Sequence, residues 1–142
     1  MAIQIIAADD KSRKNAETVI ALYEEMINEH RPRHAVQKYV RFDYIQHNSM
    51  IPDGNISIAK FFEHVQANNP RSRVVIHKVI AVQNQVWAFV NFLNFTNNQE
   101  NDRGLAGVDI YRIDDDGKLA EHWDAVQEIG DPTQAANDNG IF

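Results

Sequence analysis

Apolar residues recur at steps of three and four positions along the first part of the chain. This stripe consists of Ala16, Val19, Ile20, Tyr23, Met26 and Ile27. Such spacing predicts a helix with one face turned toward a core. Asp9 or Asp10 can cap its start, and the pattern continues to about His30. The N-terminal part of the chain is therefore expected to be helical.

Two shorter helices are expected next. Pro32 suits the first turn of one of them, which carries apolar residues at positions 35, 36, 39 and 40. The other carries apolar residues from Ile58 to Val65 and ends before Pro70. Between them lies "DYIQHNSMIPDG", residues 43–54, which we predict to be a loop. Its polar groups either hold the turn at residues 52–54 or line a cavity.

The hydrophobic period changes from about 3.6 to 2 after Pro70. Four runs rich in valine, isoleucine and aromatic residues follow: "RVVIHKVIAV" (73–82), "VWAFVNFLNFT" (86–96), "LAGVDIYRI" (105–113) and "LAEHWDAVQEI" (119–129). Each is predicted to be a strand, and Asp116-Gly117 is typical of a hairpin turn between the last two. Helices followed by antiparallel strands indicate an α+β fold, with the helices on one face of the sheet.

The chain shows no repeat and no internal linker, so its 142 residues are expected to form one domain. We place the core at about 10–130 and expect a loose polar tail over 131–142. Apolar residues make up 44% of the chain and charged residues 24%, as in ordinary globular proteins.

The net charge argues against a polyanionic partner. Fourteen basic and 20 acidic side chains leave a formal charge of -6. A nucleic-acid-binding protein normally shows a basic patch with aromatic residues between the charges. The short basic cluster at 11–14 is instead expected to be a solvated helix face. No nucleic-acid partner is predicted.

The absence of cysteine excludes disulfides, thiolate nucleophiles and zinc–thiolate sites, and it favours the cytoplasm. No apolar run approaches the roughly 20 residues of a membrane span. The opening "MAIQIIAADD" lacks a basic region, and its apolar run meets Asp9-Asp10 too soon for a signal peptide. We expect a cytoplasmic protein that does not enter the membrane.

Strand alternation assigns side chains to faces of the sheet. Asp109 and Tyr111 share one face of their strand, and His122 and Asp124 share one face of the next. The two aspartates can therefore approach each other if these faces match.

Two carboxylates at one cavity can divide the roles of proton acceptor and proton donor, because an apolar wall disfavours the ionised form. The alternative is structural: each aspartate could bind a backbone amide, pair with Arg112 or Arg103, or face solvent. The sequence pattern leaves both interpretations open.

Other polar groups offer weaker signals. Asn91 shares a face with Trp87 and Phe89, where an amide needs a partner. The histidines expected at the sheet or its mouth are His47, His77 and His122, any of which can be structural. His122 and Asp124 place two candidate metal ligands on one strand face, which is common in proteins without a metal. No H-x-H or H-E-x-x-H spacing occurs, so we predict no metal site. A serine-nucleophile elbow and a glycine-rich phosphate loop are also absent.

Two stretches resemble a known family. "YIQHNSMIPDG" followed by "FFEHV", and "GVDIYRIDDDGKLAEHWDAVQ", are similar to the SnoaL-like polyketide cyclase family of the nuclear transport factor 2-like superfamily. They also resemble bacterial proteins described as predicted SnoaL-like aldol-condensation enzymes. The resemblance covers roughly 14–129. It implies a cone-shaped α+β barrel, in which a curved antiparallel sheet packs on three helices and leaves a deep pocket open at one end.

The resemblance also implies roles for particular residues. Asp124 matches an acid/base residue that abstracts a proton next to a carbonyl, without metal or organic cofactor. Asp109 matches the polar position on the preceding strand, and His47 the histidine of the loop. His47 and Asn91 would orient the substrate oxygen. The remaining pocket candidates are Tyr44, Asn48, His77 and His122.

Comparison with two enzymes of similar fold narrows the class of reaction that the resemblance implies. Limonene epoxide hydrolase has a similar fold and carries an arginine two positions before its first aspartate, where this chain has Gly107. A site like that of ketosteroid isomerase needs a tyrosine on the first helix, and Tyr23 could serve. We therefore expect an acid/base enzyme of the aldol-condensation, cyclase or isomerase type, acting on a small hydrophobic carbonyl compound.

Members of the SnoaL-like family that this chain resembles are typically homodimers through the outer face of the sheet. A non-catalytic binding module or a dimeric interaction module of the same fold is the alternative.

Overall fold

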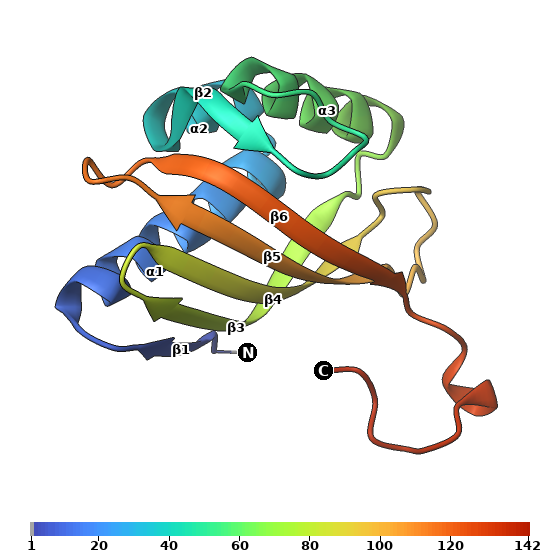
Figure 1. Cartoon of the computed structure of the whole chain (residues 1–142). Helices are drawn as coiled ribbons and strands as arrows, with labels where there is room; N and C mark the ends of the chain where they lie inside the picture. The colour runs from blue at the N-terminus through green and yellow to red at the C-terminus, as the bar shows by residue number, and fades with distance from the viewer. Residues whose placement is uncertain (1) are drawn as a thin grey trace.

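The computed structural model describes residues 2–142 and shows a helical layer against a curved sheet (Figure 1). Helices α1 (Asp10–Tyr23), α2 (Pro32–Tyr39) and α3 (Asn55–Asn68) form the helical layer. A π-helical turn, η1 (Glu24–Asn28), continues α1, and a short 3-10 turn, η2 (Pro132–Gln134), lies in the tail. The three predicted helices are all present.

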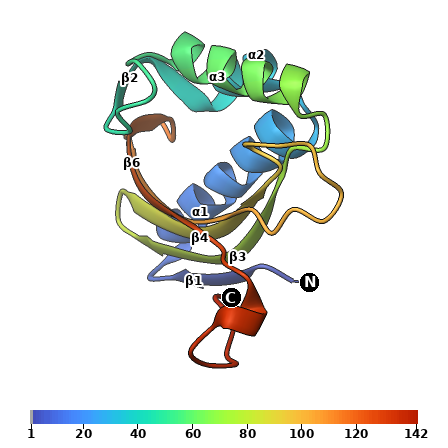
Figure 2. The ribbon, with the colours of Figure 1, turned by 90° about the vertical axis from the view of Figure 1, so that its right-hand side faces the viewer.

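The six strands of the sheet are β1 (Gln4–Ala7), β2 (Val40–Gln46), β3 (Arg73–Val82), β4 (Gln85–Leu93), β5 (Leu105–Ile113) and β6 (Leu119–Glu128). Their order is β1-β3-β4-β5-β6-β2. Strands β3 to β6 form an antiparallel meander, whereas β1 lies parallel to β3 and β2 parallel to β6. The sheet curls around α1, and α2 and α3 lie across its open side (Figure 2). The α+β fold class is confirmed, with a mixed sheet that does not close.

Three strands differ from the sequence expectation. The segment 40–46 was expected to end a helix and enter a loop, but it forms β2 at one edge of the sheet. The apolar run at 4–7 forms β1 at the other edge. The strand expected to reach Thr96 ends at Leu93 because Asn94 adopts the left-handed φ of 57°. Its backbone N–H then donates to the Asp102 carboxylate at 2.6 Å, outside the ladder.

Local chemistry explains where the helices begin. The Asp9 side chain accepts a hydrogen bond from the backbone N–H of Ser12 at 2.8 Å, which caps α1 as expected. Pro32 occupies the first turn of α2. The predicted stripe on α1 and η1 is buried against the sheet, with Ile20 half-buried at its margin. Burial of this stripe fixes α1 across the inner face of the sheet.

The β5–β6 turn sets the register of the two strands that matter most for the site. Gly117 adopts a φ of 79°, which favours glycine and fits the predicted hairpin turn. The hairpin pairs the two strands from 105 with 128 to 113 with 119. A register shift next to Arg112 is the one irregularity in this pairing.

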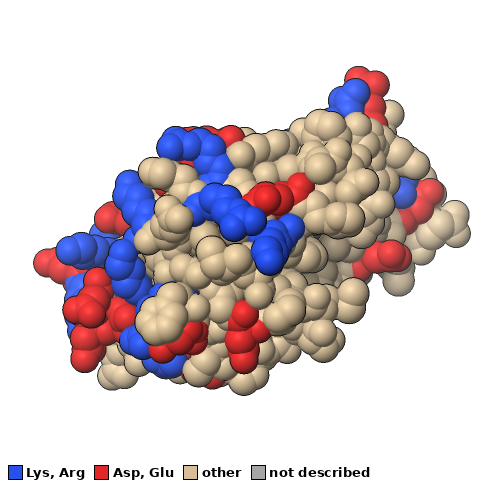
Figure 3. All heavy atoms as spheres, turned by 90° about the horizontal axis from the view of Figure 1, so that it is seen from above, with Lys and Arg blue, Asp and Glu red and all other residues tan. Residues whose placement is uncertain are grey.

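Seen from above, basic and acidic side chains lie beside one another on the surface (Figure 3). Arg41, for example, pairs with both Asp43 and Asp114. Among residues 2–142, no helix combines the length and apolarity needed to cross a membrane.

The tail beyond β6 is mostly exposed and runs along the outside of the sheet (Figures 1 and 2). It returns to the sheet at Phe142, whose ring stacks on His77 with 4.0 Å between centroids. Phe142 also contacts the ring of Phe89, at 4.9 Å. The tail therefore covers part of the outer face of β3 and β4.

Candidate functional site

A cavity of about 230 Å³ lies between the inner face of the sheet and the helices. Most of its wall is apolar and includes Met26, Ile58, Phe62, Phe92, Phe95 and Val126. One region of the wall is polar and consists of Tyr23, Asn48, Asp109, Tyr111, His122 and Asp124. A mainly apolar hollow with a few converging polar groups is the usual form of a small-molecule site.

The two aspartates meet because of strand register. Asp109 on β5 and Asp124 on β6 are direct cross-strand partners, and both line the cavity. Cross-strand partners on one face are close neighbours. The two aspartates therefore lie next to each other, as the strand alternation had allowed.

Asp109 is held in an almost fully buried position, with 2% of its surface exposed. The Tyr23 hydroxyl, from α1, donates a hydrogen bond to Asp109 Oδ2. The Tyr111 hydroxyl, from β5, donates to the Tyr23 oxygen at 2.9 Å. The other carboxylate oxygen, Oδ1, lies 2.9 Å from Nε2 of His122. Both oxygens of this buried carboxylate therefore have partners.

The tyrosines around Asp109 remain protonated at neutral pH. Burial raises the pKa of Tyr23 and of Tyr111 well above 10, and the negative charge of Asp109 raises each further. Burial likewise raises the pKa of Tyr44, with added effects of Asp109 and Asp124. These hydroxyls are consequently available as hydrogen-bond donors.

Asp124 has different surroundings. Its Oδ2 accepts a hydrogen bond from the side-chain amide of Asn48 at 2.8 Å and lies 3.9 Å from Nε2 of His122. Its side chain is 16% exposed, whereas that of Asp109 is 3% exposed. Two neighbouring carboxylates in unlike environments are suited to different proton-transfer roles.

His122 connects the two aspartates to β2. Its Nδ1 lies 2.6 Å from Oε1 of Gln46, and the backbone N–H of Asn48 donates to the same oxygen at 3.0 Å. Tyr44 lies behind the imidazole, with 6.3 Å between ring centroids and 18° between planes. The end of β2 thus positions the histidine, although this segment was expected to be a loop.

Asp109, His122 and Asp124 could also hold a cation. Each offers one ligand atom, and these atoms lie within 4.8 Å of one another. Among residues 2–142, these three form the group of potential ligands that is close enough to share an ion. The sequence placed only His122 and Asp124 on one strand face as candidate ligands, and no metal was predicted; Asp109 joins them through strand pairing.

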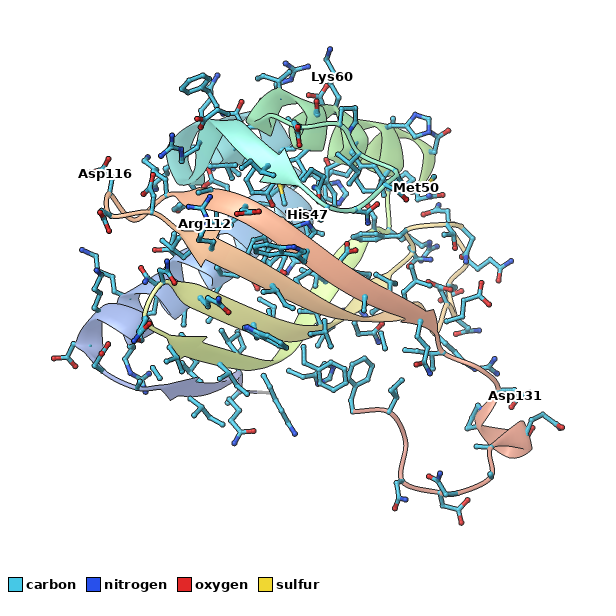
Figure 4. All side chains as sticks on the ribbon, in the orientation of Figure 1. His47, Met50, Lys60, Arg112, Asp116 and Asp131 are labelled. Atoms are coloured by element: carbon cyan, nitrogen blue, oxygen red, sulfur yellow. The ribbon has the colours of Figure 1, made fainter. Side chains whose placement is uncertain are left out.

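Three predicted site residues point away from the cavity. His47 lies on the outer side, where it stacks on Trp123 at 4.7 Å, and its Nε2 lies 2.8 Å from Glu121 (Figure 4). His77 contacts Phe142 on the outer face, and Asn91 points to that same face. The expectation that His47 and Asn91 orient the substrate oxygen does not fit this geometry, because their strands turn them away from the cavity.

The remaining predicted residues lie at or beside the polar end of the cavity. Asn48, His122 and the two aspartates line it, and Tyr44 lies behind His122. Sequence reasoning missed Gln46 and Tyr111 as site residues. Both could have been found from strand alternation, since Gln46 shares a face with Tyr44 and Asn48, and Tyr111 with Asp109. Tyr23 had been named without a direction, and the structure turns it toward Asp109.

Comparison with protein families gives one match over most of the chain. A family model described as a SnoaL-like domain matches residues 15–122. The matched region includes Asp109 and His122 and ends two positions before Asp124. A search of curated protein sequences gives no significant match.

Solved structures share the fold at low sequence identity. A protein provisionally named a polyketide cyclase, from Bacillus cereus ATCC 10987, is 14% identical with a TM-score of 0.73, and the match covers 89% of this chain and 86% of that one. A nuclear transport factor 2-like protein of unknown function from Mesorhizobium loti is 17% identical with a TM-score of 0.67, covering 88% and 99%. A provisionally named isomerase of the SnoaL-like family from Agrobacterium tumefaciens C58 is 17% identical with a TM-score of 0.64, covering 84% and 99%. At these identities the likeness shows the fold alone.

Proposed function

The chain belongs to the SnoaL-like domain family, and from its paired carboxylates we propose that it is a cofactor-independent acid/base enzyme acting on a small hydrophobic carbonyl compound. One observation carries this proposal. Asp109 and Asp124 lie side by side at the polar end of an apolar cavity, in surroundings that differ in burial and in hydrogen bonding. Such a pair can supply an acid and a base at one place.

Asp124 is the better base of the two. It lines the cavity, is the less buried carboxylate, and is held by Asn48 through one oxygen. In the proposed first step it takes a proton from the carbon next to the substrate carbonyl. The C–H electron pair then forms a C=C bond, and negative charge develops on the carbonyl oxygen. The side-chain amide of Asn48 and the imidazole of His122 line the cavity beside Asp124 and can donate hydrogen bonds to this charge, and fixed donors of this kind are usually the largest source of stabilisation in such reactions.

The enolate has two outcomes that need no further reactant. In an aldol closure, its carbon attacks a second carbonyl carbon of the same molecule, and the new alkoxide receives the proton held by Asp124. In an isomerisation, Asp124 returns the proton to a different carbon. Both routes return the base to its starting state. A cavity of about 230 Å³ suits a small or medium substrate.

A ligand of the cavity must be identified before proton abstraction can be tested. A thermal-shift screen of neutral ketones and diketones should identify compounds that raise Tm, because binding to the native state stabilises it. Each hit is then incubated with the protein in D₂O, and exchange of the α-hydrogen is followed by NMR. We expect exchange with the wild type and a loss of roughly 100-fold or more in Asp124→Asn. Exchange at the wild-type rate in Asp124→Asn would refute the proposal.

Asp116→Asn is the matched control. Asp116 lies in the exposed turn of the same hairpin (Figure 4), so this substitution changes the same charge away from the cavity. Its exchange rate should equal that of the wild type.

The apolar wall of the cavity favours one alternative, a non-catalytic module that binds a small hydrophobic molecule. This alternative predicts hits in the thermal-shift screen without any α-hydrogen exchange. It also predicts that Asp124→Asn keeps most of the ligand affinity, because the apolar wall would supply it.

We also propose that a second copy of the chain covers the outer face of the sheet. Ile80, Val82 and Trp87 lie together on β3 and β4 and are 46%, 52% and 46% exposed. Apolar patches of this kind mark interaction surfaces. Light scattering should give the mass of a dimer for the wild type and of a monomer for Trp87→Glu. Lys60→Glu, on the exposed side of α3, is the control and should remain dimeric (Figure 4). A monomeric wild type at micromolar concentration would contradict this proposal.

A further inference from the structure

The tail that follows β6 is attached to the rest of the protein at very few points. Residues 130–140 are all exposed, and Figure 2 shows this segment on the outer side of the sheet. Among residues 2–142, the hydrogen bonds of residues 130–142 all stay within the tail. Asp131 lies 3.8 Å from Arg103, but an exposed ion pair of this kind contributes little to stability. The contact that holds the tail against the sheet is therefore the ring of Phe142.

A β-bulge prepares the place where this ring lies. The register of β3 and β4 shifts between Ile76 and Lys78, so His77 is the extra residue of β3. Its imidazole lies flat against the Phe142 ring, with 4.0 Å between ring centroids and 10° between planes. Phe89 on β4 contacts the same ring at 4.9 Å. We call His77 and Phe89 the outer slot.

The outer slot holds Phe142 only loosely. Burial lowers the pKa of His77, and the charge of Lys78 lowers it further, so the imidazole is neutral at neutral pH and stacks as an aromatic surface. Nε2 of His77 is buried without a hydrogen-bond partner among residues 2–142, a state that opposes tight packing around it. Phe142 itself remains 42% exposed, and ordering the tail costs conformational entropy with little burial in return. The tail can therefore leave the slot.

The outer slot adjoins the apolar patch on which we propose that a second copy packs. Phe89 and Trp87 point to the same face of β4, two residues apart, and Trp87 pairs with Ile80 on β3. Ile80 in turn pairs with Ile6 on β1, which is 50% exposed. Once the tail leaves, the slot and the patch form one continuous apolar surface across β1, β3 and β4.

The tail and a second copy cannot occupy this surface together. Two sheets that pack face to face lie about 10 Å apart, and their side chains fill the space between them. The tail lies on this side of the sheet (Figures 1 and 2), with its Phe142 ring against β3 and β4. The sheet of a second copy can therefore cover these strands only after the tail has moved aside.

We propose that the tail is a reversible strap: with Phe142 in the outer slot it blocks pairing of two copies on this face, and its release opens the face to a second copy. The inference rests on the proposed second copy and adds how access to the outer face is controlled. Release uncovers Phe89 and one side of the His77 ring, and the second copy covers them again. The slot is thus protected from water both in the closed monomer and in the dimer.

Phe142→Ala in the whole chain removes the ring and leaves the rest of the tail in place. A dilution series in the analytical ultracentrifuge gives the dimer dissociation constant. We expect pairing to become roughly tenfold tighter or more, because both copies must release the strap and only the released fraction can pair. Gln134→Ala is the matched control, since it truncates an exposed side chain in η2 of the same tail, and its dissociation constant should equal that of the wild type.

A disulfide can hold the strap closed. The chain contains no cysteine, so His77→Cys/Phe142→Cys offers one possible bond within a chain. Electrophoresis without reductant shows whether the bond lies within one chain or joins two, and circular dichroism checks that the variant is folded. The oxidised variant should be monomeric at concentrations where its reduced form is a dimer. The wild type, treated in the same way, should not respond to the reductant. If the bond does not form, the Phe142→Ala measurement still decides.

Several results would overturn the inference. Equal dissociation constants for the wild type and Phe142→Ala would show that the tail does not block pairing, and weaker pairing in Phe142→Ala would make Phe142 part of the interface itself. An oxidised double variant that still pairs would show that the face is open while the strap is closed. A disulfide that joins two chains would show that the tails are exchanged between copies.

These failures are distinguishable from failure of the proposed function. Each of them leaves the second copy in place, whereas a chain that is monomeric in every variant at high micromolar concentration would remove the second copy and the strap together. None of the measurements uses a ligand of the cavity, so the outcome is independent of the Asp124 exchange experiment.

Discussion

Removing the Tyr23 hydroxyl would show how much the buried Asp109 carboxylate depends on its donors. Tyr23→Phe deletes the donor to Asp109 Oδ2 and also the oxygen that accepts from Tyr111. Tyr111→Phe deletes only the outer donor and leaves the bond from Tyr23 to Asp109 in place. The two tyrosines are 1% and 3% exposed, so each substitution removes one oxygen from equally dry surroundings. The pair therefore forms a matched comparison.

The expected losses differ because the partners differ in charge. A hydrogen bond to a charged group contributes about 1.5–3 kcal/mol, and a buried donor left without an acceptor costs about 1–3 kcal/mol. Tyr23→Phe should therefore lower the free energy of unfolding by about 3–4 kcal/mol. Tyr111→Phe removes one bond between neutral groups and should cost about 1 kcal/mol. Both losses are smaller than the about 5–15 kcal/mol of a typical domain, so both variants should fold.

Urea unfolding at neutral pH, followed by tryptophan fluorescence, measures both losses. The slope against urea should stay unchanged, because neither variant alters the surface exposed on unfolding. Equal losses, or a larger loss for Tyr111→Phe, would show that Tyr23 does not stabilise the Asp109 carboxylate. The description of Asp109 as a carboxylate fixed by buried donors would then be wrong.

Two further predictions concern the same cavity. Burial raises the pKa of Tyr23, Tyr44 and Tyr111 above the ordinary value of 10.0, so the unfolded chain loses these protons first. The stabilisation from these buried tyrosines should be fully present below about pH 10. Above that pH, the free energy of unfolding should fall by up to about 1.4 kcal/mol per pH unit for each tyrosine, and the urea midpoint should fall with it. A midpoint that stays constant above pH 10 would contradict this prediction. Gly107→Ala would place a Cβ 2.7 Å from Cε2 of Phe92, a ring that lines the cavity. Because the ring must move, we expect the free energy of unfolding in urea to fall by about 1–3 kcal/mol. Ligand binding in the thermal-shift assay should also weaken. Unchanged binding would show that the displaced ring does not enter the cavity.

The meeting of the two aspartates was predictable because it depends on local rules. Alternation places Asp109 and Tyr111 on one face, and it places His122 and Asp124 together on the next strand. The turn at 116–117 joins these strands directly, so pairing follows from a hairpin rather than from distant contacts. The structure agrees with this part of the sequence interpretation.

The sequence did not predict which face of each strand is turned toward the helices. Alternation correctly grouped Asn91 with Trp87 and Phe89, but it does not show which face of a strand meets the helices. Both faces of this sheet are rich in apolar residues, so hydrophobicity did not separate them. His47 is a different case, because it alternates with Gln46 and Asn48 and so had to point away from them.

Strand β2 was missed for reasons visible in its residues. Val40 continues the apolar spacing of α2, and Phe42 is 81% exposed, so the strand lacks a clean apolar face. A register shift between Val40 and Ile45 further disturbs the alternation. Its partner, β6, is parallel and distant in sequence, and parallel pairing leaves no hairpin signal. Because β2 was not recognised as a strand, the alternation that groups Gln46 with Tyr44 and Asn48 was not applied to it.

The cost of burying these polar groups supports the proposal that they serve chemistry rather than stability. The side chains of Asp109 and His122 are 3% and 6% exposed, and two buried polar groups that bind each other can often be replaced by apolar residues of similar volume with little loss of stability. The apolar wall around them shows that such residues fit this part of the fold. Instead, Tyr23 and Gln46 come from two other elements, and each satisfies one atom of the pair. Residues that break the apolar rule of a strand and are supported in this way are expected where a protein performs its function.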